Sequence, residues 1–118
     1  MCREPELKQT AEVPRMATQA LQMLKDALDA FVNRNPALAR GVLPRDAQVD
    51  ALNRQMQRDL AAHMATDPAA IERCLNLMVI FKSLERIADH ATNIAEDVVY
   101  LCEGQDIRHS KKSNPPPP

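Results

Sequence analysis

The chain has 118 residues, enough for one modest domain that folds around its own hydrophobic core without disulfide or metal staples. A formal net charge of -1, with the basic residues spread out, gives no general attraction for nucleic acid. Hydrophobic residues make up 45% but aromatic ones only 3%, with two glycines and no tryptophan, and this composition favours helices packed on helices.

The cysteines and the lengths of the apolar segments bear on where the chain works. Cys2, Cys74 and Cys102 are odd in number and form no CxxC pair, which is typical of reduced thiols in a cytoplasmic protein. No N-terminal apolar run has the length of a signal peptide, and no apolar run reaches the roughly 18 residues that span a bilayer. We therefore expect a cytoplasmic protein without membrane insertion.

The first helix is predicted over residues 14–33, after a lead-in at 1–13 that has no clear period. Pro14 suits a first helical turn, and apolar residues then recur at spacings of three and four. This predicted inner face comprises Met16, Ala17, Ala20, Leu21, Leu24, Leu28, Phe31 and Val32. The sequence NRNP at 33–36 predicts a break, with Asn35 capping the next turn.

The second helix is predicted over residues 46–65. A short helical stretch before it should end in a break or kink near Leu43, because Pro44 lacks an N–H and crowds the preceding turn. Its predicted inner face comprises Val49, Leu52, Met56, Leu60 and His63.

The third helix is predicted from Pro68 to about Glu103. Asp67 caps its start, and Gly104 should end it because glycine tolerates a positive φ. No strand pattern is present. The predicted fold class is therefore all-α, an antiparallel three-helix bundle at 14–104, followed by a flexible C-terminal tail at 105–118.

The stretch LERIADHATNIAEDV at 84–98 raises the question of a metal site, because it sets acids among apolar residues. A helix advances about 100° per residue, so four polar side chains share one ridge that faces away from the apolar side. The ridge comprises Glu85, Asp89, Asn93 and Glu96. His90 lies off this ridge and is a poor candidate for a ligand.

The second helix carries a matching polar ridge that includes Asp46 and Asp50. Counting outward from the turn at Asp67 puts Asp50 level with Glu85, and Asp46 level with Asp89. Adjacent carboxylates repel one another, and a hard cation such as Mg²⁺, Mn²⁺ or iron would remove that cost. Zinc more often takes histidine or cysteine. The alternative is that these acids form an ordinary solvated helix face.

The segment LERIADHATNIAEDVVYLCEGQDIRH resembles the C-terminal signature of the PhoU family of phosphate-uptake regulators. The similarity continues upstream through RDAQVDALNRQMQRDL and EPELKQTAEVPRMATQALQMLKDALDAFV, and covers nearly the whole chain apart from the tail. The resemblance implies an all-α fold built from two similar three-helix repeats, of which this chain resembles the second. Gly41 and Pro44 interrupt what the resemblance suggests should be one long second helix.

The resemblance also implies a divalent metal or iron (Mg, Mn, Fe or Zn) bound at a Glu/Asp-x-x-x-Asp motif. Glu85 and Asp89 fit this motif, and its extensions and the acids of the neighbouring helix are Asn93, Glu96, Asp46 and Asp50. It further implies a cytoplasmic negative regulator of the phosphate-starvation response. Its partners would be a membrane sensor histidine kinase and the ATPase subunit of a phosphate transporter.

A single repeat would leave apolar surface that a sister repeat normally covers, so we expect a homodimer that rebuilds a six-helix arrangement. One reason is that five methionines, which cannot all be central in three helices, recur along the chain. They are Met16, Met23, Met56, Met64 and Met78.

Three other classes of function were weighed against this interpretation. An enzyme is not expected, since no nucleophile has a histidine partner at a recognisable spacing and no glycine-rich phosphate loop occurs. A phosphorelay domain would use an exposed His90, but no glycine follows it to admit a partner's active site. A helical protein-interaction module without a functional metal site remains the alternative.

Overall fold

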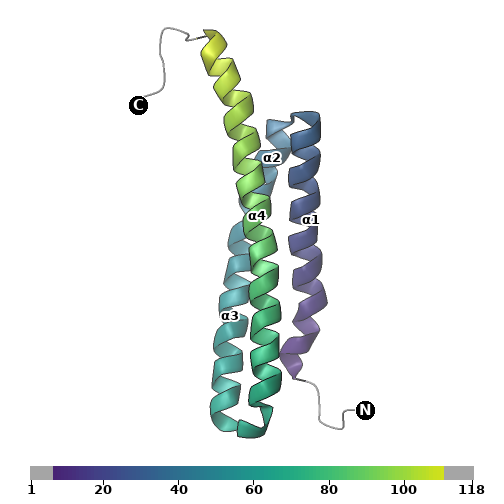
Figure 1. Ribbon diagram of the computed structural model, residues 1–118, viewed down its shortest axis with the longest axis vertical. Coiled ribbons are helices and arrows are strands. Elements are labelled where there is room, and N and C mark those ends of the chain that lie inside the picture. Colours follow the sequence, from purple (N-terminus) through teal and green to yellow (C-terminus); the bar gives the residue numbers. More distant parts are fainter. Residues whose placement is uncertain (1–6, 111–118) are drawn as a thin grey trace.

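The computed structural model describes residues 7–110, with side chains described as far as residue 104. Four α-helices follow a short 3₁₀ turn at Lys8–Ala11: α1 (Glu12–Asn33), α2 (Pro36–Val42), α3 (Arg45–Thr66) and α4 (Ile71–Ser110). A second 3₁₀ turn, Pro68–Ala70, joins α3 to α4. No strand occurs among these residues, and the expected all-α three-helix bundle is confirmed (Figure 1).

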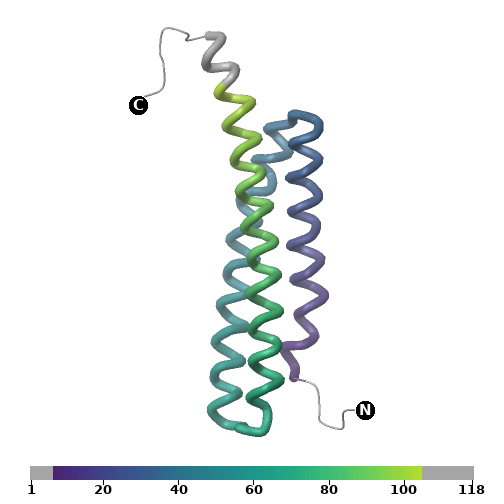
Figure 2. The backbone as a smooth tube through the Cα atoms, in the orientation of Figure 1, coloured from purple at the N-terminus to yellow at the C-terminus, as the bar shows by residue number. Residues whose placement is uncertain are grey.

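The long helix α4 is the element on which the others pack. It contacts α1, α2 and α3, whereas α1 and α3 make few contacts with each other. Figure 2 shows α1 and α4 running in the same direction and α3 running in the opposite one. Within residues 7–110, no helix has both the length and the apolar content needed to cross a bilayer.

The turn between α1 and α2 forms where the sequence predicts it. Arg34 takes a left-handed conformation with a φ of 50°, and the Asn35 N–H donates to the Ala30 carbonyl at 2.9 Å. The Asn35 side chain then accepts from the Leu38 N–H at 3.1 Å and caps α2, with Pro36 in the first turn. The predicted break near Leu43 is also confirmed, since α2 ends at Val42 and α3 begins at Arg45.

The predicted end of the last helix is wrong. Gly104 has no positive φ, and α4 continues through it to Ser110. At the other end, residues 7–13 are more structured than a lead-in, because Leu7 is buried and α1 already begins at Glu12. Residues 1–6 and 111–118 lie outside the described part of the chain.

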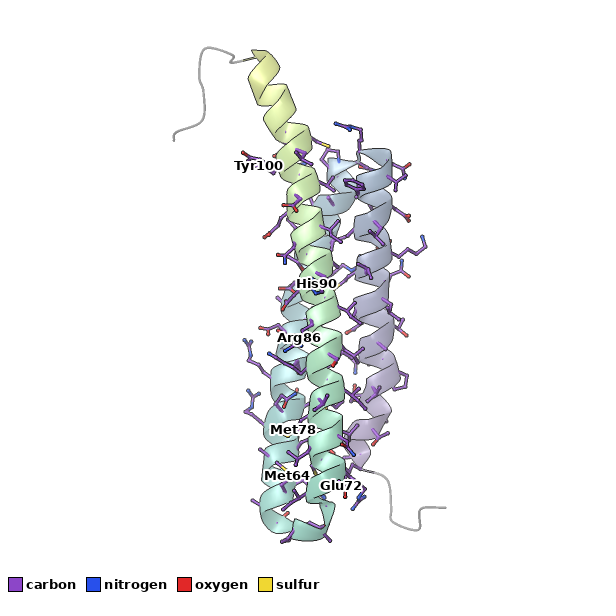
Figure 3. All side chains as sticks on the ribbon, in the orientation of Figure 1. Met64, Glu72, Met78, Arg86, His90 and Tyr100 are labelled. Atoms are coloured by element: carbon purple, nitrogen blue, oxygen red, sulfur yellow. The ribbon has the colours of Figure 1, made fainter. Side chains whose placement is uncertain are left out.

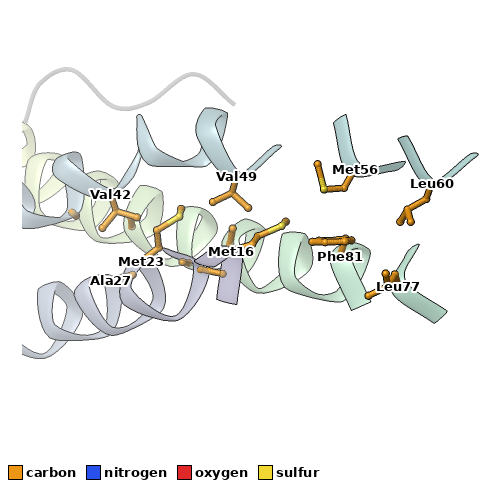
Figure 4. Packing of buried hydrophobic residues seen from close by; sticks show 14 of the residues in the cluster. Met16, Met23, Ala27, Val42, Val49, Met56, Leu60, Leu77 and Phe81 are labelled. Carbon is orange, nitrogen blue, oxygen red and sulfur yellow. The ribbon is translucent and has the colours of Figure 1, made fainter. Parts of the chain in front are cut away.

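The core divides into a seam of small residues and a region of larger ones. Fully buried alanines lie on both α1 and α4, the two helices with the most extensive mutual contact: Ala20, Ala27, Ala30, Ala88, Ala91 and Ala95. Small side chains allow a close approach of two helix axes. Larger apolar side chains, including Phe81, Leu60 and Met56, fill the space between α3 and α4 (Figure 4).

The predicted inner face of α1 is partly wrong. Met16 and Ala20 are buried as expected, but several of the larger apolar residues point outward. Exposed side chains on α1 are those of Leu21, Leu28, Phe31 and Val32. Met23, Ala27 and Ala30 replace them in the core, so the helix buries the edge of its apolar sector that carries alanine and methionine.

The methionine argument for a second copy is also wrong. Met16, Met23 and Met56 are buried within a single copy, and Met64 and Met78 pack against the same core. Methionine is flexible enough to fill irregular gaps, and three helices accommodate all five. The homodimer itself stays a prediction that needs a different argument.

Candidate functional site

Four of the six predicted acidic-site residues lie together where α3 and α4 run side by side. The carboxyl groups of Asp46 on α3 and Asp89 on α4 lie close enough to interact, at the level that counting from the Asp67 turn predicts. Glu85 and Asp50 lie close enough to act on Asp89 through their charges. We call Asp46, Asp50, Glu85 and Asp89 the acidic cluster.

The electrostatics of this cluster show in the pKa of Asp89. Partial burial of its carboxyl group comes first, followed by the charges of Glu85 and Asp46, and all of them raise that pKa above its ordinary value, with a smaller contribution from the charge of Asp50. Asp89 is exposed as a whole residue, so solvent screens part of the interaction with the neighbouring charges. When all four side chains are ionised, the carboxylates of the acidic cluster therefore repel one another and destabilise the folded state.

Basic side chains neutralise part of the cluster from its edges. Arg54 donates to Asp50 at 2.7 Å, and the Lys82 ammonium lies 3.3 Å from Glu85, whose side chain is only 12% exposed. No such partner reaches the inner side, where Oδ1 of Asp46 is buried without a hydrogen bond. A buried carboxylate oxygen without a donor is costly, and a bound cation would satisfy it.

Asn93 and Glu96, the other two predicted site residues, are exposed on α4, and neither contributes to the interactions of Asp89. Asp46 lies in the first turn of α3, level with Asp89. Asn93 and Glu96 are one and two turns further along α4, where the neighbouring helix is α2, whose sequence PALARGV has no acid. The break between α2 and α3 thus limits the cluster to four residues.

The arrangement supplies oxygen donors but not a finished coordination sphere. Among the described residues, no three or more histidine, cysteine, aspartate or glutamate side chains already have positions that would hold one ion. Carboxylate oxygens from two helices suit Mg²⁺, Mn²⁺ or iron, which complete their shells with water. These side chains fit a hydrated hard cation, provided that their rotamers adjust on binding.

Sequence reasoning missed two polar contacts that fix the helices around the cluster. The Gln57 amide donates to the buried Asn53 side chain at 3.2 Å and to the Met78 carbonyl at 2.9 Å, which ties α3 to α4. The place of buried Asn53 between Val49 and Met56, two residues of the predicted inner face, was the available signal. Arg45 donates to Asp26 at 2.7 Å, which ties the start of α3 to α1 and lowers the pKa of Asp26.

The remaining candidate groups lie away from the cluster. His90 is exposed on α4 between Arg86 and Tyr100 (Figure 3). Cys74 is buried in the core, where burial raises the pKa of its thiol, and Cys102 is half-buried. Cys2 lies outside the described residues.

A family model described as the PhoU domain matches residues 13–98 of the chain. Relatives with the name "Phosphate-specific transport system accessory protein PhoU homolog" occur in several bacteria. That of Pseudomonas aeruginosa is 45% identical over 98 residues, which are 83% of this chain and 40% of the relative. That of Rhizobium meliloti is 40% identical over 89 residues, 75% of this chain and 38% of the relative. The chain thus spans about 40% of the length of these relatives.

Proposed function

Because the chain belongs to the PhoU family, we propose that it regulates phosphate uptake and phosphate-starvation signalling as a negative regulator. It acts by metal-dependent docking onto two proteins at the inner face of the membrane. These are a membrane sensor histidine kinase and the ATPase subunit of a phosphate transporter. The relatives are named as accessory proteins of a phosphate-specific transport system, which supports a regulatory role rather than catalysis.

The observation that carries the metal-dependent part is the contact between Asp46 and Asp89. Two carboxyl groups on different helices meet there, and Glu85 and Asp50 add charge that raises the pKa of Asp89. A hard cation held by Asp46, Asp50, Glu85 and Asp89 would neutralise this charge and join α3 to α4. A metal held in this way would offer its remaining coordination positions, otherwise filled by water, to oxygen ligands of a partner.

Metal content is the direct test. We would purify the parent chain and Glu85→Ala/Asp89→Ala without chelator and measure bound metals by mass spectrometry. Asp29→Ala/Glu72→Ala removes two acids elsewhere, half-buried Asp29 and exposed Glu72, and is the matched control. Near-stoichiometric Mg, Mn, Fe or Zn in the parent and control, lost only in Glu85→Ala/Asp89→Ala, supports the metal site.

The second candidate is a helical interaction module without a functional metal. It is favoured by the lack, within residues 7–110, of any ready-made group of three ligands. Binding to the purified transporter ATPase subunit, measured by calorimetry with Mn²⁺ and with chelator, separates the two. Equal affinity in both conditions would show that binding does not depend on metal and would support the interaction module.

The proposal also includes a homodimer, in which a second copy rebuilds a six-helix arrangement. Its support is the large apolar surface that one copy exposes on α1 and α4. Light scattering at tens of micromolar tests it, and a monomer at that concentration would remove the homodimer.

A further inference from the structure

The outer side of the seam between α1 and α4 carries an apolar face. On α1, large apolar side chains remain exposed at spacings of three, four and seven residues. On α4, a row of exposed or half-buried apolar side chains recurs every seven residues, which keeps it on one side of the helix. The apolar face comprises Leu21, Leu28, Phe31 and Val32 on α1 and Ile80, Ile87, Ile94 and Leu101 on α4.

The two rows form one continuous surface. An open groove of about 490 Å³ lies between them and is lined by Leu28, Phe31, Ile94, Asp97, Tyr100 and Leu101. Phe31 is 58% exposed and Leu28 is 45% exposed, although both belong to the apolar sector of an amphipathic helix. A contiguous apolar face of this kind is typical of a protein–protein contact rather than of solvent-exposed surface.

The size of the face matches what a stable dimer needs. From Ile80 to Leu101 the face extends along α4 for roughly 30 Å, at about 1.5 Å per residue. Two adjacent helices make it roughly 20 Å wide, since each is about 10 Å across. The projected area is then about 600 Å², close to the roughly 800 Å² of accessible surface that each partner contributes to a standard interface.

The charges at its edges suit a second copy of the same chain. Lys25 lies at the outer edge of α1, one turn before Leu28, and Asp97 lies at the outer edge of α4. Asp97 has no hydrogen bond or ion pair within the described residues. A twofold axis parallel to the helices places α1 of one copy over α4 of the other. Lys25 of one copy then faces Asp97 of the other, and this pairing occurs twice.

We infer that a second copy binds through the apolar face, an inference that rests on the homodimer proposed above and gives it a location. On α4 the row of Ile87 and Ile94 points about 140–160° away from Asp89, at 100° per residue. The acidic cluster therefore stays open in the dimer. The relatives retain more than half of their length outside the matched region.

The test compares aspartate substitutions on and off the face by sedimentation equilibrium of the full chain. Leu28→Asp and Phe31→Asp should each weaken the dimer at least a hundredfold, because each change occurs twice in a twofold interface. The matched control is Leu75→Asp, whose side chain is 49% exposed and lines a groove with Gln57 of α3 on another side of α4. It should change the dissociation constant less than threefold. Helical content by circular dichroism checks that each variant folds.

A charge-exchange series tests the orientation. Lys25→Glu and Asp97→Lys should each weaken the dimer, and the double variant should restore it. A dimeric parent that neither Leu28→Asp nor Phe31→Asp weakens would overturn this face and leave the homodimer standing. A monomeric parent would overturn both, whereas the metal content would still report on the acidic cluster independently.

Discussion

Replacing Asp89 by asparagine should stabilise the metal-free protein at neutral pH. The substitution keeps the shape of the side chain and removes one of four clustered negative charges. Like charges four residues apart on a helix cost a few tenths of a kcal/mol, and Glu85 is such a neighbour. Asp46 and Asp50 add repulsion from α3, which solvent reduces because Asp89 is exposed. We expect a gain of about 0.5 kcal/mol in the free energy of unfolding, or roughly 2–4 °C in the melting temperature.

The sign of the pH dependence follows from the raised pKa of Asp89. The folded state holds this proton more tightly than the unfolded state, whose aspartate pKa is about 3.9. Stability of the parent therefore falls as the pH rises from that value through the pKa of the folded state. The advantage of Asp89→Asn should be complete at neutral pH and should disappear below about pH 4, where the parent is protonated in both states.

Urea denaturation in the presence of a chelator, at pH 7 and pH 4, measures this difference. Glu96→Gln is the control, since it removes one charge from the same helix at a residue outside the acidic cluster. It should change stability by less than about 0.3 kcal/mol, as surface substitutions usually do. If Asp89→Asn is less stable than the parent at pH 7, repulsion is not the dominant interaction of Asp89. With Mn²⁺ added, the parent should become more stable than Asp89→Asn, because it binds the ion more tightly and binding stabilises the folded state.

Three further substitutions test the packing around the site. Asp26→Asn should cost about 1 kcal/mol by urea denaturation at pH 7, because it weakens the partly buried bond from Arg45. Because the pKa of Asp26 is lowered in the folded state, its ionised form stabilises the fold above about pH 4, and this stabilisation is lost as the pH falls through the folded-state pKa. The difference in free energy of unfolding between the parent and Asp26→Asn should therefore disappear at lower pH. Gly41→Ala should raise the free energy of unfolding by about 0.5–1 kcal/mol, since the added Cβ meets nothing within 4 Å in a helical turn. Ala91→Leu should lose about 2 kcal/mol in a thermal melt because it overpacks the fully buried seam between α1 and α4, and an unchanged melting temperature would contradict close packing there.

Turn residues made most of the helix boundaries predictable. Asn35 caps α2 with its side chain and Pro36 lies in the first turn, as predicted. At the second turn the predicted cap is wrong, since Asp67 makes no side-chain cap and Pro68 begins a 3₁₀ turn ahead of α4. The prediction that the last helix ends at Gly104 was wrong because a single glycine lowers the stability of a helix by only about 1 kcal/mol. No proline follows it closely, so α4 continues.

The position of the acidic cluster along α3 and α4 was predictable for a similar reason. A short turn fixes the register of two antiparallel helices, so counting from Asp67 brought Asp46 level with Asp89. The same counting could not show that Asn93 and Glu96 lack neighbours, because this depends on where α3 begins. Angular position on one helix defines a face but not what another helix places opposite it.

The buried edge of α1 could not be predicted from periodicity. Its apolar sector is wider than the contact that α4 makes, and spacing alone does not distinguish the edge with Ala27 and Met23 from the edge with Leu28 and Phe31. Close packing against the alanines of α4 decides the outcome in favour of the small residues. The leucine edge remains outside, where it forms the apolar face.

The central position of α4 also governs how the molecule opens. Since α1 and α3 contact each other little, releasing α1 breaks chiefly one interface, whereas releasing α4 removes the contacts that hold the other helices together. Opening of α1 alone is thus a lower-energy fluctuation than opening of α4. Amide hydrogens of α1 should exchange with solvent through such partial opening. Those in the middle of α4, around Ala88 and Ala91, should exchange only when the whole chain unfolds.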